Sequence, residues 1–155
     1  MIRHVLIGLC LLAVPNVALA LSCARPDIAR SFHIANDAPD TYQVFLGELE
    51  YARQNKRATT TPHNRKARLR ARGVTRTGFS AWVDRDVTVT VTCAGPWCGS
   101  IPENEQLLIF LRQDGKTWVI DAPPCGGFAF INPGQAELRA LRACLSGGAC
   151  KPRYR

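Results

Sequence analysis

The sequence lacks the short patterns on which small enzymes and metal-binding domains depend. It has no Gly-x-Ser-x-Gly turn around a serine, and no Cys-x-x-Cys pair of the kind that binds zinc or exchanges disulfides. Beyond residue 20 it keeps two histidines, His33 and His63, which are far apart in the chain. It has no internal repeat. We therefore expect no enzyme, no cofactor and no metal site.

The first twenty residues read as an export signal. Residues 1–20 carry Arg3, then an apolar run too short for a comfortable membrane span, then a small-x-small cleavage motif that ends at Ala20. Lipidation at Cys23 is an alternative, although the residues before it fit that signal poorly. We expect cleavage after Ala20, a single domain over residues 21–155 with no transmembrane segment, and a periplasmic or extracellular location.

Removal of the signal changes the cysteine count. The whole chain has seven cysteines, and the signal takes Cys10 with it. An even number in a small exported domain indicates three disulfides, and six cysteines allow 15 pairings among which sequence alone does not choose. The six that remain are Cys23, Cys93, Cys98, Cys125, Cys144 and Cys150.

The rest of the chain is patterned mainly as short strands between two helices. Alternation and β-branched content predict five or six short strands, and Trp82 and Trp118 are placed in strands as core residues. Asn132 is the expected N-cap of the last helix, with Pro133 at its first turn. A small closed or partly open β-barrel flanked by helices fits this order, because closure removes exposed strand edges. The predicted segments are a helix over 26–32, strands over 41–49, 66–72, 86–93, 106–111 and 117–120, and a helix from 132.

Three local patterns line up with one known family. The mature chain begins Leu-Ser-Cys-Ala-Arg-Pro at residues 21–26, Cys98-Gly99 precedes a Leu-rich segment at 107–111, and Pro124-Cys125 follows Trp118. This order resembles the netrin-like fold of the tissue inhibitors of metalloproteinases and their bacterial relatives. The resemblance covers nearly the whole mature chain, and it implies an OB-type barrel of five to six strands, stapled by disulfides, with an N-terminal and a C-terminal helix.

The resemblance also implies a disulfide pairing. Cys23 matches the family's second cysteine and would pair with Cys125. The cysteine that opens the animal inhibitors is replaced here by Leu21, which leaves Cys98 without its distant partner, so Cys93 would take it. The last two cysteines, Cys144 and Cys150, would close the C-terminal turn.

In that family the N-terminal residue inhibits a protease by chelating the protease's zinc through its α-amine and carbonyl. Cleavage after Ala20 would leave both groups free on Leu21, so the inhibitory edge implied by the resemblance is Leu21, Ser22 and Cys23. The disulfide that fixes this geometry in the family is absent at Leu21, and a flexible chelator loses more entropy on binding. A metalloprotease is therefore the alternative partner, and the leading one is a protein or anionic surface contacted through the basic segment.

The positive charge of the chain is concentrated in one segment. After the signal is removed, 19 basic residues face 12 acidic ones; outside 53–76 the chain has ten basic residues and twelve acidic ones, and 53–76 itself contains no Asp or Glu. Residues 66–72 alternate basic with small or apolar side chains, which predicts a strand with one cationic face. The basic residues in the window are Arg53, Lys56, Arg57, Arg65, Lys66, Arg68, Arg70, Arg72 and Arg76.

Three interpretations of the basic segment stay open. It is a solvated strand face that discourages edge pairing, a contact for an anionic surface or protein partner of the cell envelope, or a nucleic-acid face. Nucleic acid is not expected, since few aromatic residues interleave with the charges and the signal directs the protein outward. The candidate contact patch is Arg65, Lys66, Arg68, Arg70, Arg72 and Arg76.

A second candidate contact is the tryptophan between two cysteines. Trp97 lies in the loop between Cys93 and Cys98, where a disulfide would present it as a rigid aromatic anchor. The competing interpretation is that Trp97 caps the barrel core. The leading hypothesis from sequence is thus an exported, non-enzymatic binding module.

Overall fold

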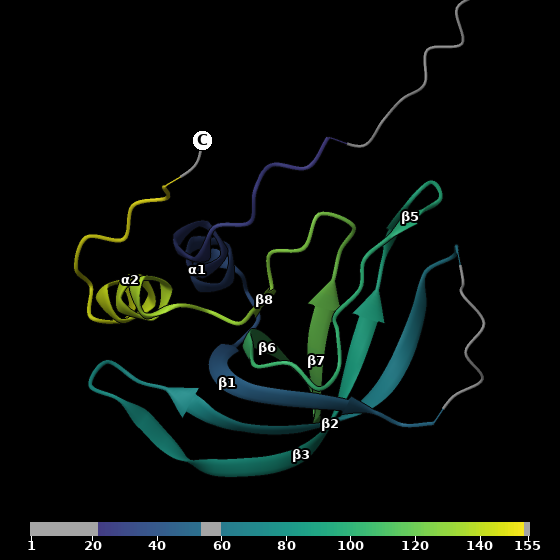
Figure 1. The fold of residues 1–155 in the computed structure, drawn as a ribbon, viewed down its shortest axis with the longest axis horizontal. Coiled ribbons are helices and arrows are strands. Elements are labelled where there is room, and N and C mark those ends of the chain that lie inside the picture. Colours follow the sequence, from purple (N-terminus) through teal and green to yellow (C-terminus); the bar gives the residue numbers. More distant parts are fainter. Residues whose placement is uncertain (1–21, 54–59, 154–155) are drawn as a thin grey trace, which may run out of the picture.

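The computed structural model describes residues 22–53 and 60–153, which form a mainly β domain (Figure 1). Two helices and eight strands or strand fragments follow one another in these residues. In chain order they are α1 (Ile28–Asp37), β1 (Tyr42–Tyr51), β2 (His63–Val74), β3 (Phe79–Val91), β4 (Cys93–Ala94), β5 (Trp97–Cys98), β6 (Leu107–Asp114), β7 (Thr117–Ala122), β8 (Ala129–Ile131) and α2 (Gln135–Leu145).

Five of these strands close into a barrel. The order is β1-β2-β3-β7-β6, and β1 closes the circle because it pairs with β2 on one side and with β6 on the other. Every pairing in the circle is antiparallel except β3–β7, which is parallel. The short β8 extends the sheet from β6, while β4 and β5 form a separate hairpin. The predicted fold class, a small OB-type barrel with two helices, is confirmed.

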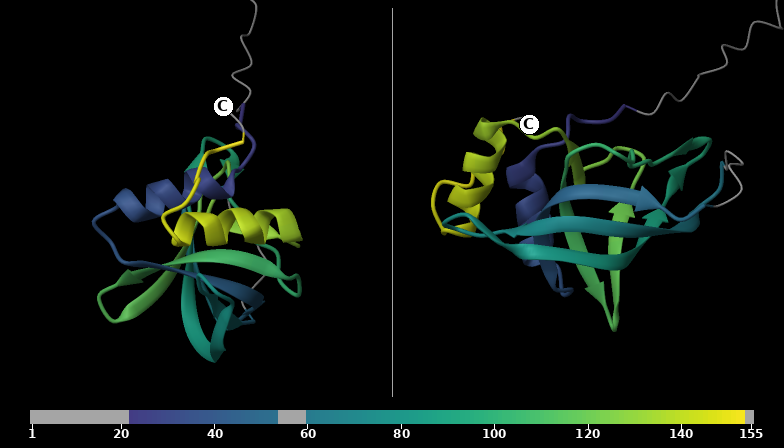
Figure 2. Two further views of the ribbon diagram at one scale, coloured as in Figure 1. Left: turned by 90° about the vertical axis from the view of Figure 1, so that its left-hand side faces the viewer. Right: turned by 60° about the horizontal axis from the view of Figure 1, so that its bottom comes forward.

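The clearest sequence pattern in the core is the apolar run of β6. Leu107, Ile109 and Leu111 point into the barrel, where they join the inward side chains of the other strands. Leu108 and Phe110 point outward into a second cluster with residues of α1 and α2. The two helices lie side by side over this strand (Figures 1 and 2). The run has no polar residue because both faces of β6 are covered.

The helix ends follow local capping chemistry. The buried Asp27 caps α1 by accepting a hydrogen bond from the backbone N–H of Arg30 at 3.0 Å. The expected start of the last helix at Asn132 is wrong, since α2 begins at Gln135 with Gly134 as its N-cap and the Glu137 carboxylate accepting from the Gly134 N–H. Asn132 has a φ of 47° and bonds through its backbone N–H to Gln106, which holds the end of β8 instead.

Three disulfides form in the described residues, with the pairing that the family resemblance implies. Cys23–Cys125 joins the segment before α1 to the connection after β7 across 102 positions of sequence. The other two close short loops, Cys93–Cys98 in the β4–β5 hairpin and Cys144–Cys150 after α2. Disulfides persist in oxidising compartments, so this chain belongs to an extracellular or comparable oxidising environment.

The expected signal, residues 1–20, lies outside the described residues, as do Leu21, Lys56 and Arg57. In the ranges that the structure covers, neither helix has the length and apolar character needed to cross a membrane.

Candidate binding face on strands β1 to β3

The predicted basic strand face exists, and it forms the middle of a wider surface. In β2 the residues Ala67, Leu69 and Ala71 point into the barrel, so the residues between them point outward. Direct cross-strand partners point to the same side of a sheet. The outward basic residues of β2 therefore share one outer face with the outward residues of β1 and β3.

Those neighbours are acidic, and this corrects the expected cationic face. Register places Arg70 between Glu48 of β1 and Asp84 of β3, and it places Arg68 between Glu50 and Asp86. We call the eight charged side chains of this face the outer ladder. It holds four basic and four acidic residues, so its formal charge is zero. Its members are Glu48, Glu50, Lys66, Arg68, Arg70, Arg72, Asp84 and Asp86.

Arg68 is the most heavily paired member of the outer ladder. Its Nε donates to Asp84 at 2.5 Å and its Nη1 to Asp86 at 3.0 Å, while Arg70 stands 3.6 Å from the other Asp84 oxygen. The hydrogen bond from Arg68 is the main cause that lowers the pKa of the Asp84 carboxyl below its ordinary value. The same bond raises the pKa of Arg68. Because these groups are exposed, the pairs contribute little to stability and chiefly cancel charge.

One residue of the candidate patch lies off this face, and another lies in the turn between β2 and β3. Arg65 alternates to the other side of β2, where its guanidinium carbon stacks 3.4 Å from the centre of the Tyr51 ring. Burial raises the pKa of Tyr51, whose hydroxyl donates to the Ile101 carbonyl at 2.9 Å. Arg76 is exposed between β2 and β3. The six-residue patch is therefore not one continuous surface.

Trp82 is not a core residue, which is a second correction. It is 68% exposed, because the alternation of β3 puts positions 82, 84 and 86 on the outer face. Its cross-strand partner Arg72 holds its guanidinium 5.9 Å from the Trp82 ring and 5.2 Å from the Phe79 ring. Trp118, by contrast, packs against the barrel core as expected.

Arg72 pairs across the strands with Trp82 of β3 on one side and with Leu46 of β1 on the other. We call these three residues the tryptophan row. A groove of about 370 Å³ runs beside the row and is also lined by Phe79, Arg70 and Glu48. Arg142 of α2 also contacts the Phe79 ring, with its guanidinium carbon 5.1 Å from the ring centre. The buried Nε of Arg142 has no hydrogen-bond partner in the described residues. This end of the outer face differs from the rest of the outer ladder, because the cross-strand partners of Arg72 are Leu46 and Trp82, whereas those of Arg68 and Arg70 are acidic.

The Trp97 hairpin presents a separate exposed aromatic group. Trp97 is 48% exposed on β5, in the loop that the Cys93–Cys98 disulfide closes. This exposure argues against the core-cap interpretation, and the contact-loop interpretation stays a prediction. The β4–β5 hairpin is a sheet of its own, so Trp97 and the tryptophan row belong to different surfaces.

The histidines have structural contacts at separate places. His33 bonds through Nε2 to the Cys150 carbonyl, and His63 bonds through Nδ1 to the Thr61 carbonyl, both at 2.8 Å. Over residues 22–53 and 60–153, no group of three or more His, Cys, Asp or Glu side chains converges as a metal site would require.

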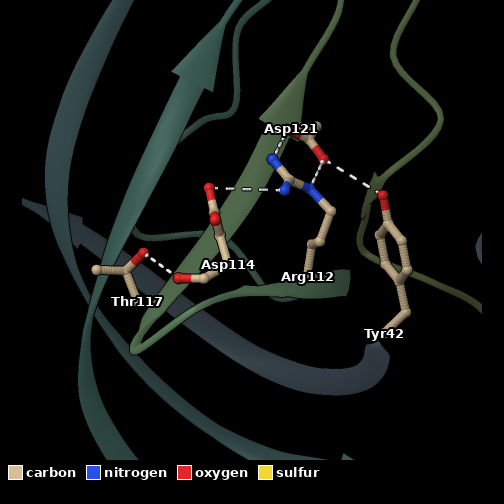
Figure 3. A network of polar contacts seen from close by, with 5 residues as sticks. All are labelled: Tyr42, Arg112, Asp114, Thr117 and Asp121. Carbon is tan, nitrogen blue, oxygen red and sulfur yellow. Dashed lines mark hydrogen bonds and ion pairs between the residues drawn. The ribbon is translucent and has the colours of Figure 1, made fainter. Parts of the chain in front are cut away.

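The best-developed polar network ties the β6–β7 hairpin to β1 (Figure 3). Arg112 donates two hydrogen bonds to the Asp121 carboxylate, at 3.0 and 3.2 Å, and Tyr42 donates to the same carboxylate at 3.4 Å. Burial, followed by the Asp121 charge, raises the pKa of Tyr42, and the bond to Asp121 raises that of Arg112. Because the guanidinium occupies both carboxylate oxygens, the network acts as a clamp between strands.

The predicted inhibitory edge is described only in part. Ser22 and Cys23 are exposed, and the disulfide to Cys125 anchors them. The segment leaves the molecule on the same side as the β4–β5 hairpin (Figures 1 and 2).

Fold and surface together define a disulfide-stapled OB-type barrel whose outer face carries a tryptophan row beside a balanced outer ladder. Comparison with protein-family models, with curated proteins and with solved structures finds no match to this chain. Its function must therefore be argued from its own surface chemistry.

Proposed function

We propose that the protein is an exported, non-enzymatic binding module that contacts a protein partner through the tryptophan row. The observation that carries the proposal is Trp82, a large aromatic side chain left 68% exposed beside Arg72. Tryptophan and arginine are the residues most enriched among those that dominate binding energy at protein interfaces. The adjacent groove gives a partner's side chain a place to insert.

The chemistry of the row defines the partner's surface. Arg72 donates from Nε to the Ser80 carbonyl, which holds its guanidinium at the Trp82 ring. A carboxylate flanked by an apolar side chain would complement this pair, because the carboxylate meets the guanidinium and the apolar group meets the indole.

The balance of the outer ladder favours a protein over a polyanionic surface. An extended polyanion gains affinity from many phosphate-like contacts, each with its own cation. Here Glu48 and Glu50 on one side and Asp84 and Asp86 on the other would repel such a chain. The anionic envelope surface is therefore the less favoured partner, and its binding would fall steeply with salt.

Export is supported by two independent features. Residues 1–20 have the charged start, apolar run and small-residue site of a secretory signal. The six cysteines that follow all enter disulfides, as in proteins that mature outside the cytoplasm.

The first prediction concerns Trp82. We expect the Trp82→Ala variant, immobilised and exposed to the extracellular and envelope fractions of the source cells, to retain about 30-fold less of its specific partner than the wild type. That loss corresponds to about 2 kcal/mol, the threshold for a dominant interface residue. Quantitative mass spectrometry of the bound proteins measures it.

Trp97→Ala is the matched control, since it removes an exposed tryptophan from another surface. It should leave the bound partner unchanged, and raising the salt should weaken capture only modestly. Equal capture by Trp82→Ala and wild type, or a capture lost uniformly with salt, would contradict the proposal.

A second candidate function is inhibition of a metalloprotease by the mature N-terminus. The observation that favours it is the Cys23–Cys125 disulfide, which fastens the segment next to Leu21 to the barrel. If this function is correct, protein that begins at Leu21 inhibits a broad-specificity zinc endopeptidase, and one added alanine ahead of Leu21 abolishes inhibition by blocking the α-amine. Absence of inhibition by the Leu21 form across a panel of such enzymes would exclude it.

A further inference from the structure

We infer that the cleft between α1, β1 and the β2–β3 end of the barrel is a binding site for a small organic monocarboxylate with an apolar body, held by Arg85. The cleft has a volume of about 610 Å³, within the usual range of ligand sites. It is separate from the groove beside the tryptophan row: both are lined by residues of β1, β2 and β3, but they have no lining residue in common. We call it the Arg85 cleft.

Arg85 occupies an unusual position for a cation. On β3 the residues Val83, Val87 and Val89 alternate toward the inside of the barrel, and Arg85 lies in phase with them. Its guanidinium carbon is 4.8 Å from the Trp118 ring and 5.9 Å from the Phe45 ring. The sequence pattern would place an apolar residue here, so the arginine costs solvation that an aliphatic side chain would not.

The guanidinium is also incompletely paired. Its Nη1 is buried without a hydrogen-bond partner, and no carboxylate of the described residues forms an ion pair with it. Buried polar groups are nearly always hydrogen-bonded, and an unpaired one calls for a water, an ion or a functional reason. The two ring contacts hold the cation in place but supply no acceptor oxygen.

The lining of the cleft selects the ligand. Among the described lining residues Arg85 is the one with a full charge, while the walls include Phe32, Val44, Phe110 and Leu145. The planar guanidinium fork matches a carboxylate, which would pair with Arg85 where Arg85 lines the cleft. One cation in apolar walls suits a monoanion, because a second negative charge would be desolvated without a partner. A medium-chain fatty acid or an arylalkanoate has this combination of features.

Isothermal titration of the full mature chain with decanoate tests the inference. We expect saturable 1:1 binding, with 1-decanol, which has the same chain and no charge, at least tenfold weaker. Arg85→Met, which keeps the length and removes the charge, should weaken decanoate at least tenfold and leave decanol unchanged. Arg139→Met is the matched control, because Arg139 is exposed on α2 and outside the cleft; it should bind as the wild type does.

A second variant guards against misfolding of Arg85→Met. Gln43 is exposed and lines the cleft, so Gln43→Trp should fill the mouth without touching the core and reduce decanoate binding at least tenfold. Chemical-shift changes on binding should centre on Phe45 and Val83, which line the cleft. No binding of decanoate at 1 mM, equal affinity for decanoate and decanol, unchanged affinity in both variants, or shifts centred on Trp82 would each overturn the inference.

Discussion

Replacing Cys23 and Cys125 together by serine is expected to lower the free energy of unfolding by about 4–5 kcal/mol. The two cysteines are 102 positions apart, and in the chain-entropy model a loop of about 100 residues contributes about 4.7 kcal/mol by restricting the unfolded chain. Domains of this size have total stabilities of about 5–15 kcal/mol, so the loss would leave a marginal fold. Urea denaturation of both proteins, followed by tryptophan fluorescence, measures the difference.

The local setting makes the same bond important for the N-terminal segment. Just after Cys23, Asp27 accepts hydrogen bonds from the backbone N–H of Arg30 at 3.0 Å and of Arg153 at 2.9 Å. One buried carboxylate thus caps α1 and holds the C-terminal segment. When the disulfide is lost, both ends of the chain should therefore become susceptible to proteolysis earlier than the barrel does.

The hairpin disulfide provides the matched control. Cys93 and Cys98 are five positions apart, and the same model gives about 2 kcal/mol for so short a loop. The Cys93→Ser, Cys98→Ser double variant should therefore lose less than half as much stability. A larger loss from the hairpin pair than from the long-range pair would contradict this interpretation.

Gly47→Ala is expected to lower the free energy of unfolding by about 3 kcal/mol or to open the barrel, the second large effect. Gly47 is the position at which β1 pairs with Ala71 of β2 and with Leu107 of β6. A Cβ there would clash with the Arg70 carbonyl oxygen and with Ala71, which are backbone and inward-facing groups of the next strand. Overpacking of a filled core costs about 1–3 kcal/mol, and backbone cannot move aside as a flexible side chain can.

Gly78→Ala is the control for this substitution. Gly78 lies between β2 and β3, and a Cβ there meets nothing within 4 Å. Its denaturation midpoint should stay close to that of the wild type. A Gly47→Ala protein as stable as the wild type would show that β1 does not need its close approach to β2 for closure.

The strands with strong alternation could be predicted from sequence, and the relations between strands could not. The inward Ala67 and Leu69 of β2 and the doubly covered run of β6 follow from local patterns alone. The acids opposite Arg68 and Arg70 come from segments more than a dozen positions away, so only the register reveals the balanced outer ladder. A charge count along the chain overstates the charge of the face.

The exposure of Trp82 could be predicted from the sequence. The period of two in β3 is plain from Asp86 onward, and extending it back places Trp82 in phase with Asp84 and Asp86 on the wet side. Tryptophan is usually buried, and this general tendency conflicts with the local pattern of the strand. Arg85, in phase with the valines, carries the same kind of signal for the cleft.

The start of α2 could not be predicted, because Asn132 is a good N-cap by type and is engaged elsewhere. Its left-handed backbone and its bonds to residues 105 and 106 belong to the end of β8. The netrin-like resemblance gave the correct disulfide pairs, and kinship with that family remains a prediction.

Site-specific photo-crosslinking beside the tryptophan row provides the decisive test of whether the row is the contact surface. A benzophenone amino acid replaces Gln106, which is exposed and lines the groove beside the row, so that Trp82 stays in place. A second protein carries the same amino acid in place of Trp97. We expect one discrete protein adduct from position 106, absent from position 97 and lost when Arg72→Glu reverses the charge beside Trp82 in a protein with an unchanged thermal melt. No adduct from position 106, or the same adduct from both positions, would contradict the assignment of the tryptophan row as the contact surface.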